Sequence, residues 1–212
     1  MYPKPIKEFI DRFSKLPGIG PRQAARLAFW ILNNSKTLRQ DLKKALEGLD
    51  TDAQTCPACF FVIDGSTSSP QDGGNDKCHF CDNPSRDRKT ICVVEKETDL
   101  ATIERSGTYK GLYHVLGGLF SALDTAVPKN LRLPELINRV AGRAKDEKME
   151  EIIIALSPTH EGDLTAHYLE RSLKPLKVKI TRLGRGLPYG SDVEFADAQT
   201  LSGALESRKE FK

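Results

Sequence analysis

The chain has 212 residues, a net charge of +3, 39% hydrophobic and 29% charged residues, which is the composition of a soluble globular protein. This length suffices for one sizeable core with smaller appendages. The longest apolar runs, such as residues 152–156, are far too short to cross a bilayer, which excludes a transmembrane segment. Because no basic stretch followed by an apolar one occurs at the N-terminus, we expect a cytoplasmic protein.

The positive charge is concentrated in the first quarter of the chain. Residues 1–50 contain ten Lys or Arg and five Asp or Glu, so they carry +5, whereas the remaining residues sum to −2. This asymmetry indicates that an anionic partner binds at the N-terminal end. The alternative is a basic pair of helices that has no partner.

Two short helices joined by a glycine-rich turn are predicted within this basic region. Apolar residues recur at helical spacing in two groups, Ile6, Phe9, Ile10 and Phe13 followed by Ala24, Leu27, Ala28 and Ile31. Between the groups, residues 16–20 read Leu-Pro-Gly-Ile-Gly, which ends the first helix, and Pro21 suits the first position of the second. This arrangement resembles the helix-hairpin-helix motif of DNA-binding proteins.

The turn and the start of the second helix carry the residues expected to bind DNA. Gly18 and Gly20 let the backbone approach a phosphate, and the N–H groups that open the helix point outward. Arg22 and Arg26 lie four residues apart on one side of that helix, where they can donate charge-assisted bonds to phosphates. We expect binding that is independent of base sequence and sensitive to salt. An ordinary helical hairpin, or a dimer contact, is the alternative interpretation.

Four cysteines form two tight pairs, Cys56 with Cys59 and Cys78 with Cys81, separated by eighteen mostly polar residues. A two-residue gap lets each pair direct both thiolates at one metal ion, and two pairs complete the closed tetrahedral shell typical of structural zinc. The segment is too small to bury enough surface to fold alone, so bound zinc would supply the difference. The alternative is a pair of disulfides in a secreted protein.

The residues around the cysteines complete this small zinc ribbon. Residues 60–63 are apolar and are expected to form a short strand, whereas residues 64–76 are rich in Gly, Ser and Asp and predict a surface loop. Cys92 lies in an apolar strand pattern, which predicts a buried thiol outside the metal site.

From residue 90 onward, strand and helix patterns alternate. Strands are expected at residues 90–94, 111–116, 151–156 and 177–183, and helices at residues 99–105, 133–144 and 161–173. Strands separated by helices predict an α/β fold with a mainly parallel, covered sheet. The tail at residues 190–212 is expected to contain one short amphipathic helix.

Acidic residues are expected at the carboxyl ends of these strands, where ligands of parallel sheets bind. Glu95 follows the first strand, and Glu161 and Asp163 follow a later one. The arrangement resembles the Toprim domain of topoisomerases, primases and nucleases, in which a glutamate and an Asp-x-Asp hold magnesium. Here Ser157 and Thr159 occupy the two aspartate positions, and hydroxyls are poor ligands for a hard cation.

We therefore interpret the domain as non-catalytic. One alternative is an active nuclease or topoisomerase that uses Glu95, Glu161 and Asp163 with magnesium. Another is a protein-interaction module that does not contact DNA.

The order of the motifs resembles the RecR family of bacterial recombination mediators along essentially the whole chain. Besides the hairpin and the four cysteines, the matching blocks are residues 91–95, 109–118, 157–162 and 181–188. The expected domains are a helix-hairpin-helix region at 1–54, a four-cysteine zinc finger at 55–83, a Toprim domain at 89–186 and a C-terminal tail at 187–212. Two departures are a longer loop between the cysteine pairs and Ser157 in place of the more usual asparagine.

The resemblance implies a role in DNA repair without catalysis. Members of this family act with RecO and RecF to load RecA on gapped single-stranded DNA, and they form dimers or ring-shaped tetramers. By position, Arg22 and Arg26 match the residues of the hairpin that face DNA. The acidic residues Glu95, Glu161 and Asp163 mark the expected side for RecO.

Overall fold

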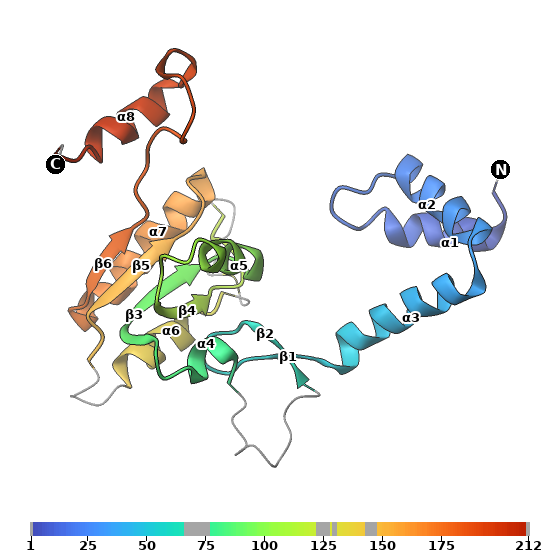
Figure 1. Ribbon diagram of the computed structural model, residues 1–212, viewed down its shortest axis with the longest axis horizontal. Coiled ribbons are helices and arrows are strands. Elements are labelled where there is room, and N and C mark those ends of the chain that lie inside the picture. The colour runs from blue at the N-terminus through green and yellow to red at the C-terminus, as the bar shows by residue number, and fades with distance from the viewer. Residues whose placement is uncertain (1, 66–76, 122–127, 129–130, 143–147, 211–212) are drawn as a thin grey trace. The chain divides into compact units, whose positions relative to one another are not determined.

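The computed structural model describes residues 2–65, 77–121, 128, 131–142 and 148–210 (Figure 1). The chain divides into two compact units, which we call the N-terminal unit (residues 1–54 and 64–67) and the C-terminal unit (residues 55–63 and 68–212). Most of the loop expected at residues 64–76, and the end of the helix expected at 133–144, lie outside the described residues.

The N-terminal unit contains the expected helical hairpin, formed by α1 (Lys4–Phe13) and α2 (Pro21–Asn33). Ala24 and Ala28 are the buried residues of α2, and the small size of alanine lets the two helices approach closely. The rings of Phe9 and Phe13 stack on α1 with their centroids 3.8 Å apart. The apolar spacing in the sequence therefore marks the face along which the helices pack.

A third helix, α3 (Lys36–Thr51), follows the hairpin and was not expected. Ser35 caps its start, because the Oγ atom accepts a hydrogen bond of 3.1 Å from the backbone N–H of Leu38. Arg39 reaches back from α3 and donates to the carbonyl oxygens of Ile31 and Asn34, at the end of α2. One guanidinium thus adds donors at a helix end, where carbonyl oxygens lack their full set of intrahelical partners.

A short two-stranded sheet, β1 (Ala53–Thr55) with β2 (Val62–Asp64), flanks the first cysteine pair along the chain. In the second pair, Cys78 is the N-cap residue of α4 (His79–Asp82) and Cys81 lies within that helix. The strand expected at residues 60–63 begins two residues later. Phe60 has a φ of 65°, and its N–H donates to the carbonyl oxygen of Cys56 at 2.9 Å. This tight turn around the thiols delays the extended conformation until Val62.

The C-terminal unit is built on a sheet of four parallel strands, which confirms the expected α/β fold (Figure 1). Its members are β3 (Asp87–Val94), β4 (Gly111–Val115), β5 (Glu151–Ala155) and β6 (Lys179–Arg182). They lie in the order β4-β3-β5-β6, so β4 and β6 are the edge strands. Val94 at the end of β3 is opposite Val115 and Ala155, which brings three strand ends to the same level.

Both faces of this sheet are covered. One core cluster joins Ile91, Val93 and Ile154 to helices α6 (Leu133–Ala141) and α7 (His160–Leu173). The alternate residues, such as Cys92 and Val94, belong to a second cluster that includes the four cysteines and Leu100 of α5 (Glu97–Arg105). The four-cysteine segment therefore forms part of a layer over the sheet. Cys92 is 2% exposed, which confirms the expected buried thiol.

A short 3-10 turn at Lys174–Leu176 joins α7 to β6, and a second at Val193–Phe195 lies between β6 and α8 (Ala198–Glu206), the expected helix of the tail. The Asp197 carboxylate caps α8 by accepting from the backbone N–H groups of Gln199 and Thr200, each at 2.9 Å. Among the described helices, none combines the length and the apolar composition needed to cross a membrane.

Candidate functional site

The turn between α1 and α2 exposes its backbone. Gly18 has a φ of +75°, a left-handed conformation that favours glycine, and a Cβ atom there would meet nothing within 4 Å. Gly20 occupies the N-cap position of α2, and the space around its Cα is equally open. The glycines thus provide both the shape of the turn and unobstructed access to its main chain.

The start of α2 is suited to bind an anion. No side chain caps this helix, its first turn contains no acidic residue, and Pro21 has no N–H to satisfy. The remaining N–H groups of the first turn concentrate positive potential at this end. Arg22 and Arg26 are exposed one turn apart, and neither forms an ion pair with any residue that the structure describes. The four residues predicted to bind DNA therefore lie along one solvent-facing turn and helix.

A hollow of about 740 Å³ lies beside the two arginines. Its other lining residues include Tyr2, Phe29 and Trp30, and the Trp30 side chain is 56% exposed. Aromatic rings next to cations can stack on nucleic-acid bases. We did not expect these rings at the site from the sequence, although the position of Phe29 and Trp30 on α2, about two turns beyond Arg22, was a usable signal.

The second candidate site is the group of four thiols predicted from the cysteine spacing. Cys56, Cys59, Cys78 and Cys81 are all buried, and their Sγ atoms all lie within 4.8 Å of one another. The five cysteines of the chain are free thiols, and the Sγ atoms of Cys59 and Cys78 are 3.3 Å apart, well beyond the length of a disulfide bond. The geometry therefore favours a metal site over the disulfide alternative.

The electrostatics of the four thiols match this interpretation. Hydrogen bonding to Cys59 lowers the pKa of the Cys56 thiol far below its ordinary value, and the same contact raises the pKa of Cys59. The backbone N–H of Cys78 also donates to the Sγ of Cys56 at 3.3 Å. Sulfurs that share protons in this way become thiolate ligands when a cation displaces those protons. The four cysteines can thus hold a metal ion.

The four-thiol centre is joined directly to the sheet. The N–H of Val115 donates to the carbonyl oxygen of Cys59 at 2.8 Å, at the end of β4. Phe80, between the second pair of cysteines, packs edge-on against Tyr113 with ring centroids 5.4 Å apart. A metal held by the thiols would therefore order the layer that covers one face of the sheet.

The third candidate site is the carboxyl edge of the sheet. The segment from Ser157 to Thr159 follows β5, and the Thr159 hydroxyl caps α7 by accepting from the N–H of Gly162 at 3.1 Å. A Cβ atom at Gly162 would lie 2.0 Å from the carbonyl oxygen of Ser157. The loop and the first turn of α7 are therefore packed so closely that glycine is required there.

The three acidic residues predicted at this edge have different environments. Glu161 is exposed in the first turn of α7, and Glu95 is half-buried after β3. Asp163 accepts hydrogen bonds from Arg182, at 2.6 Å, and from Arg185, and the Arg182 contact is the main cause of a lowered Asp163 pKa. Within the described ranges, the four cysteines are the one set of three or more His, Cys, Asp or Glu side chains that gathers like a metal site.

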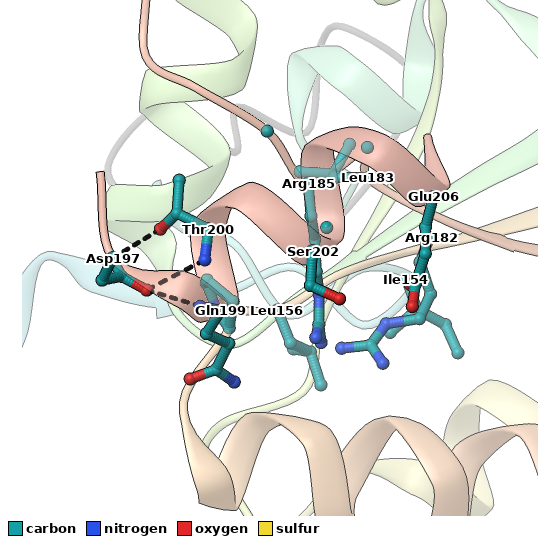
Figure 2. Close-up of a pocket in the computed structure, with 14 residues that line it drawn as sticks. Ile154, Leu156, Arg182, Leu183, Arg185, Asp197, Gln199, Thr200, Ser202 and Glu206 are labelled. Carbon is teal, nitrogen blue, oxygen red and sulfur yellow. Dashed lines mark hydrogen bonds between the residues drawn. The ribbon is translucent and has the colours of Figure 1, made fainter. Parts of the chain in front are cut away.

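A hollow of about 630 Å³ lies next to this ion cluster, between the end of the sheet and α8. Arg182 and Arg185 extend side by side below α8, where Ser202 and Glu206 also line the hollow (Figure 2). The sequence did not predict it, because the tail and the strand ends are brought together only by the fold. The Asp163 carboxylate is thus held by Arg182 and Arg185, whereas Glu161 is exposed to solvent.

Sequence profiles of known families match the chain in three places. The profile described as RecR, helix-hairpin-helix, matches residues 6–49, the Toprim domain matches residues 89–184, and the profile described as RecR, C-terminal, matches residues 186–209. Together with the parallel sheet and the four-thiol centre, these matches define a Toprim-domain protein that carries an N-terminal helix-hairpin-helix.

Two curated relatives extend the similarity over nearly the whole chain. The "Recombination protein RecR" of Roseiflexus castenholzii is 42% identical over 208 residues, which cover 98% of this chain and 95% of the relative. The protein of the same name from Roseiflexus sp. (strain RS-1) is 43% identical with the same coverage. The chain belongs to the RecR family.

Proposed function

We propose that this chain is a cytoplasmic, DNA-binding recombination mediator that catalyses no reaction itself. In this proposal it acts with RecO and RecF to promote the loading of RecA on gapped single-stranded DNA. The observation that carries the proposal is the exposed pair of Arg22 and Arg26 beside the uncapped start of α2. The name of the curated relatives, recombination protein, supports the cellular role.

DNA would bind through its phosphates. The main chain at Gly18 and Gly20 allows close approach, and the first turn of α2 offers N–H donors. Arg22 and Arg26 would add two cationic contacts to adjacent phosphates. Because such contacts read no base edges, binding would not depend on sequence. One hairpin makes few contacts, so useful affinity would come from several subunits, as a dimer or a ring-shaped tetramer, acting on one DNA.

The metal would be zinc with a structural role. Four buried thiols without a histidine or carboxylate form the donor set that zinc prefers, with no position left for substrate. The ligands proposed are Cys56, Cys59, Cys78 and Cys81. Bound zinc would fix the ends of the segment whose other residues pack on the sheet.

The partner proteins would bind at the carboxyl edge of the sheet. Of the acidic residues proposed for RecO, Glu161 is the one that stands exposed at the start of α7. Glu95 and Asp163 would contribute to the negative potential of the same edge, Asp163 less so because Arg182 and Arg185 offset its charge. This ion cluster also disfavours the rival magnesium enzyme, which needs a free Asp163. Cleavage or relaxation of DNA by the purified chain with magnesium, abolished by Glu95→Gln, would contradict the proposed absence of catalysis.

The DNA interface can be tested by the salt dependence of binding. We expect Arg22→Ala and Arg26→Ala each to weaken binding to DNA of any sequence. Each should also lower the slope of log affinity against log salt by about one unit, because one phosphate contact is lost. Fluorescence anisotropy at several salt concentrations measures both quantities. Lys43→Ala is the control, since it removes one exposed charge from α3; equal slopes in all four proteins would remove the hairpin from the DNA site.

A further inference from the structure

The outer edge of β4, which faces away from β3, is contacted by three arginines. β4 is an edge strand, and the backbone of its alternate residues faces away from β3. The outward carbonyl oxygens are contacted by guanidinium nitrogens in three pairs: Gly111 with Arg86 at 2.8 Å, Tyr113 with Arg139 at 2.6 Å, and Val115 with Arg132 at 3.5 Å. Such cover satisfies backbone groups that would otherwise be left without partners and blocks edge-to-edge pairing.

The same three arginines contact the four-cysteine segment. The guanidinium of Arg86 lies 4.9 Å from the centre of the Phe80 ring, and that of Arg132 lies 4.9 Å from the centre of the Phe60 ring. Arg139 differs from both, because its Nη2 donates to the Sγ of Cys81 at 3.7 Å. Among these arginines it is the one that reaches a thiol.

Four thiolates around a divalent cation carry a net charge of −2, and here the thiols are buried. Burying such a charge is costly unless cations and hydrogen-bond donors lie nearby. Arg139, half-buried on α6, supplies both at Cys81. We propose that Arg139 is a positioning residue for the metal centre, which orients the Cys81 thiolate, offsets part of the charge of the metal–thiolate group and couples it to β4. This inference rests on the metal proposed for the four cysteines.

The shape of the arginine side chain explains why it suits this position. Nη1 donates to the carbonyl oxygen of Tyr113 while Nη2 donates to the Sγ of Cys81, so one planar group holds a strand and a ligand at a fixed separation. A lysine ammonium keeps the charge but not the two-pronged geometry. Outer contacts of this kind orient metal ligands, and their loss costs about 10- to 100-fold in metal affinity.

The test compares zinc affinity among variants of the full chain by competition with a chromophoric chelator. We expect Arg139→Gln to bind zinc about 10- to 100-fold more weakly than the wild type. Arg139→Lys, which retains the charge, should lose less and protects the test against a folding defect in the first variant. Arg132→Gln is the matched control, because it removes a guanidinium that contacts Phe60 and β4 but no sulfur, and it should bind zinc within about twofold of the wild type.

A second readout is the sulfur-to-cobalt charge-transfer band of the cobalt-substituted chain. A hydrogen bond to a thiolate stabilises its lone pairs, so the band of Arg139→Gln should move to lower energy, whereas that of Arg132→Gln should not. If the wild type binds zinc, Arg139→Gln binds it within twofold as tightly, and the band does not move, then the role of Arg139 is overturned while the metal site stands. A wild-type chain that takes up neither zinc nor cobalt would overturn the metal site as well.

Discussion

His114 is a fully buried ionisable residue of β4. Its side chain is 0% exposed, Nε2 lies 2.8 Å from the carbonyl oxygen of Arg132, and Nδ1 has no hydrogen-bond partner among the described residues. Burial is the main cause that lowers its pKa to about 4. The folded protein therefore holds this imidazole in the neutral state, and its pKa falls well below that of the same residue in an unfolded chain.

This burial predicts a loss of stability in mild acid. Between pH 6.5 and pH 4 the unfolded chain binds a proton at His114 and the folded chain does not, so the free energy of unfolding falls as the pH falls. The slope due to this residue approaches about 1.4 kcal/mol per pH unit, and the total approaches about 3 kcal/mol. Urea unfolding at pH 7.5, 6 and 5 measures it. In His114→Gln the slope should be smaller by that amount; an identical slope would show that His114 does not carry the effect.

Among individual residues, the sequence predicted the roles of those whose partners are close in the chain. The four cysteines could be assigned because a two-residue gap by itself sets the separation of two sulfurs. Arg139 could not, since it lies 58 residues from Cys81 and nothing near it in the sequence indicates a thiol. The pairing of Asp163 with Arg182 and Arg185 escaped prediction for the same reason.

Among the elements, α7 depends on one close contact at its start. The first turn holds Gly162 against the loop that follows β5, and the Thr159 hydroxyl accepts the N–H of that glycine. This contact positions the exposed Glu161 relative to the strand end. The geometry of the proposed partner surface therefore depends on a residue that bears no side chain.

We expect Gly162→Ala to destabilise the protein by about 1–3 kcal/mol. A methyl group there would lie 2.0 Å from the carbonyl oxygen of Ser157, so the backbone has to move, and this cost exceeds the gain in helix propensity. Chemical unfolding measures the change. Gly186→Ala is the control, because its methyl group would lie 3.9 Å from Ala204 and should be nearly neutral; equal effects of the two substitutions would refute this account.

Hydrophobic patterns located most elements of the C-terminal unit, because a strand of a parallel sheet is buried on both faces and therefore appears in the sequence as a short apolar run. The expected strand at residues 151–156 corresponds to Glu151–Ala155, and the expected helix at 161–173 to His160–Leu173. The helix α3 was missed, because its leucines are largely exposed and lie among many charged residues. The start of β2 was misplaced because the turn at Phe60 depends on the thiol cluster, which a pattern of apolar residues does not encode.

At the scale of the whole molecule, the four-cysteine segment is part of the core of the C-terminal unit. Its thiols belong to the same buried cluster as Cys92, Val94 and Tyr113, which lie on one face of the sheet. Here the sheet would lose cover on one face if the segment came loose, so the metal site and the fold of the unit are expected to be stabilised together.

Replacing one ligand should therefore destabilise the entire C-terminal unit. We expect Cys78→Ser to abolish zinc binding, to lower Tm by about 10 °C or more, and to increase the binding of a hydrophobic dye, since roughly 3–5 kcal/mol is lost and apolar surface is exposed. Differential scanning fluorimetry and metal analysis check these outcomes. Cys92→Ala, at a buried thiol outside the ligand set, should retain zinc at a cost of about 1 kcal/mol. A Cys78→Ser protein that melts like the wild type would show the metal to be dispensable.

The cap of α7 coincides with one of the two positions, Ser157 and Thr159, at which Toprim enzymes have aspartates. Thr159 opens the helix with a hydroxyl oxygen, and aspartate performs that task at least as well. An exchange between the two residues would thus leave the helix start intact, in either direction. The requirements of the helix start therefore do not decide between threonine and aspartate at this position.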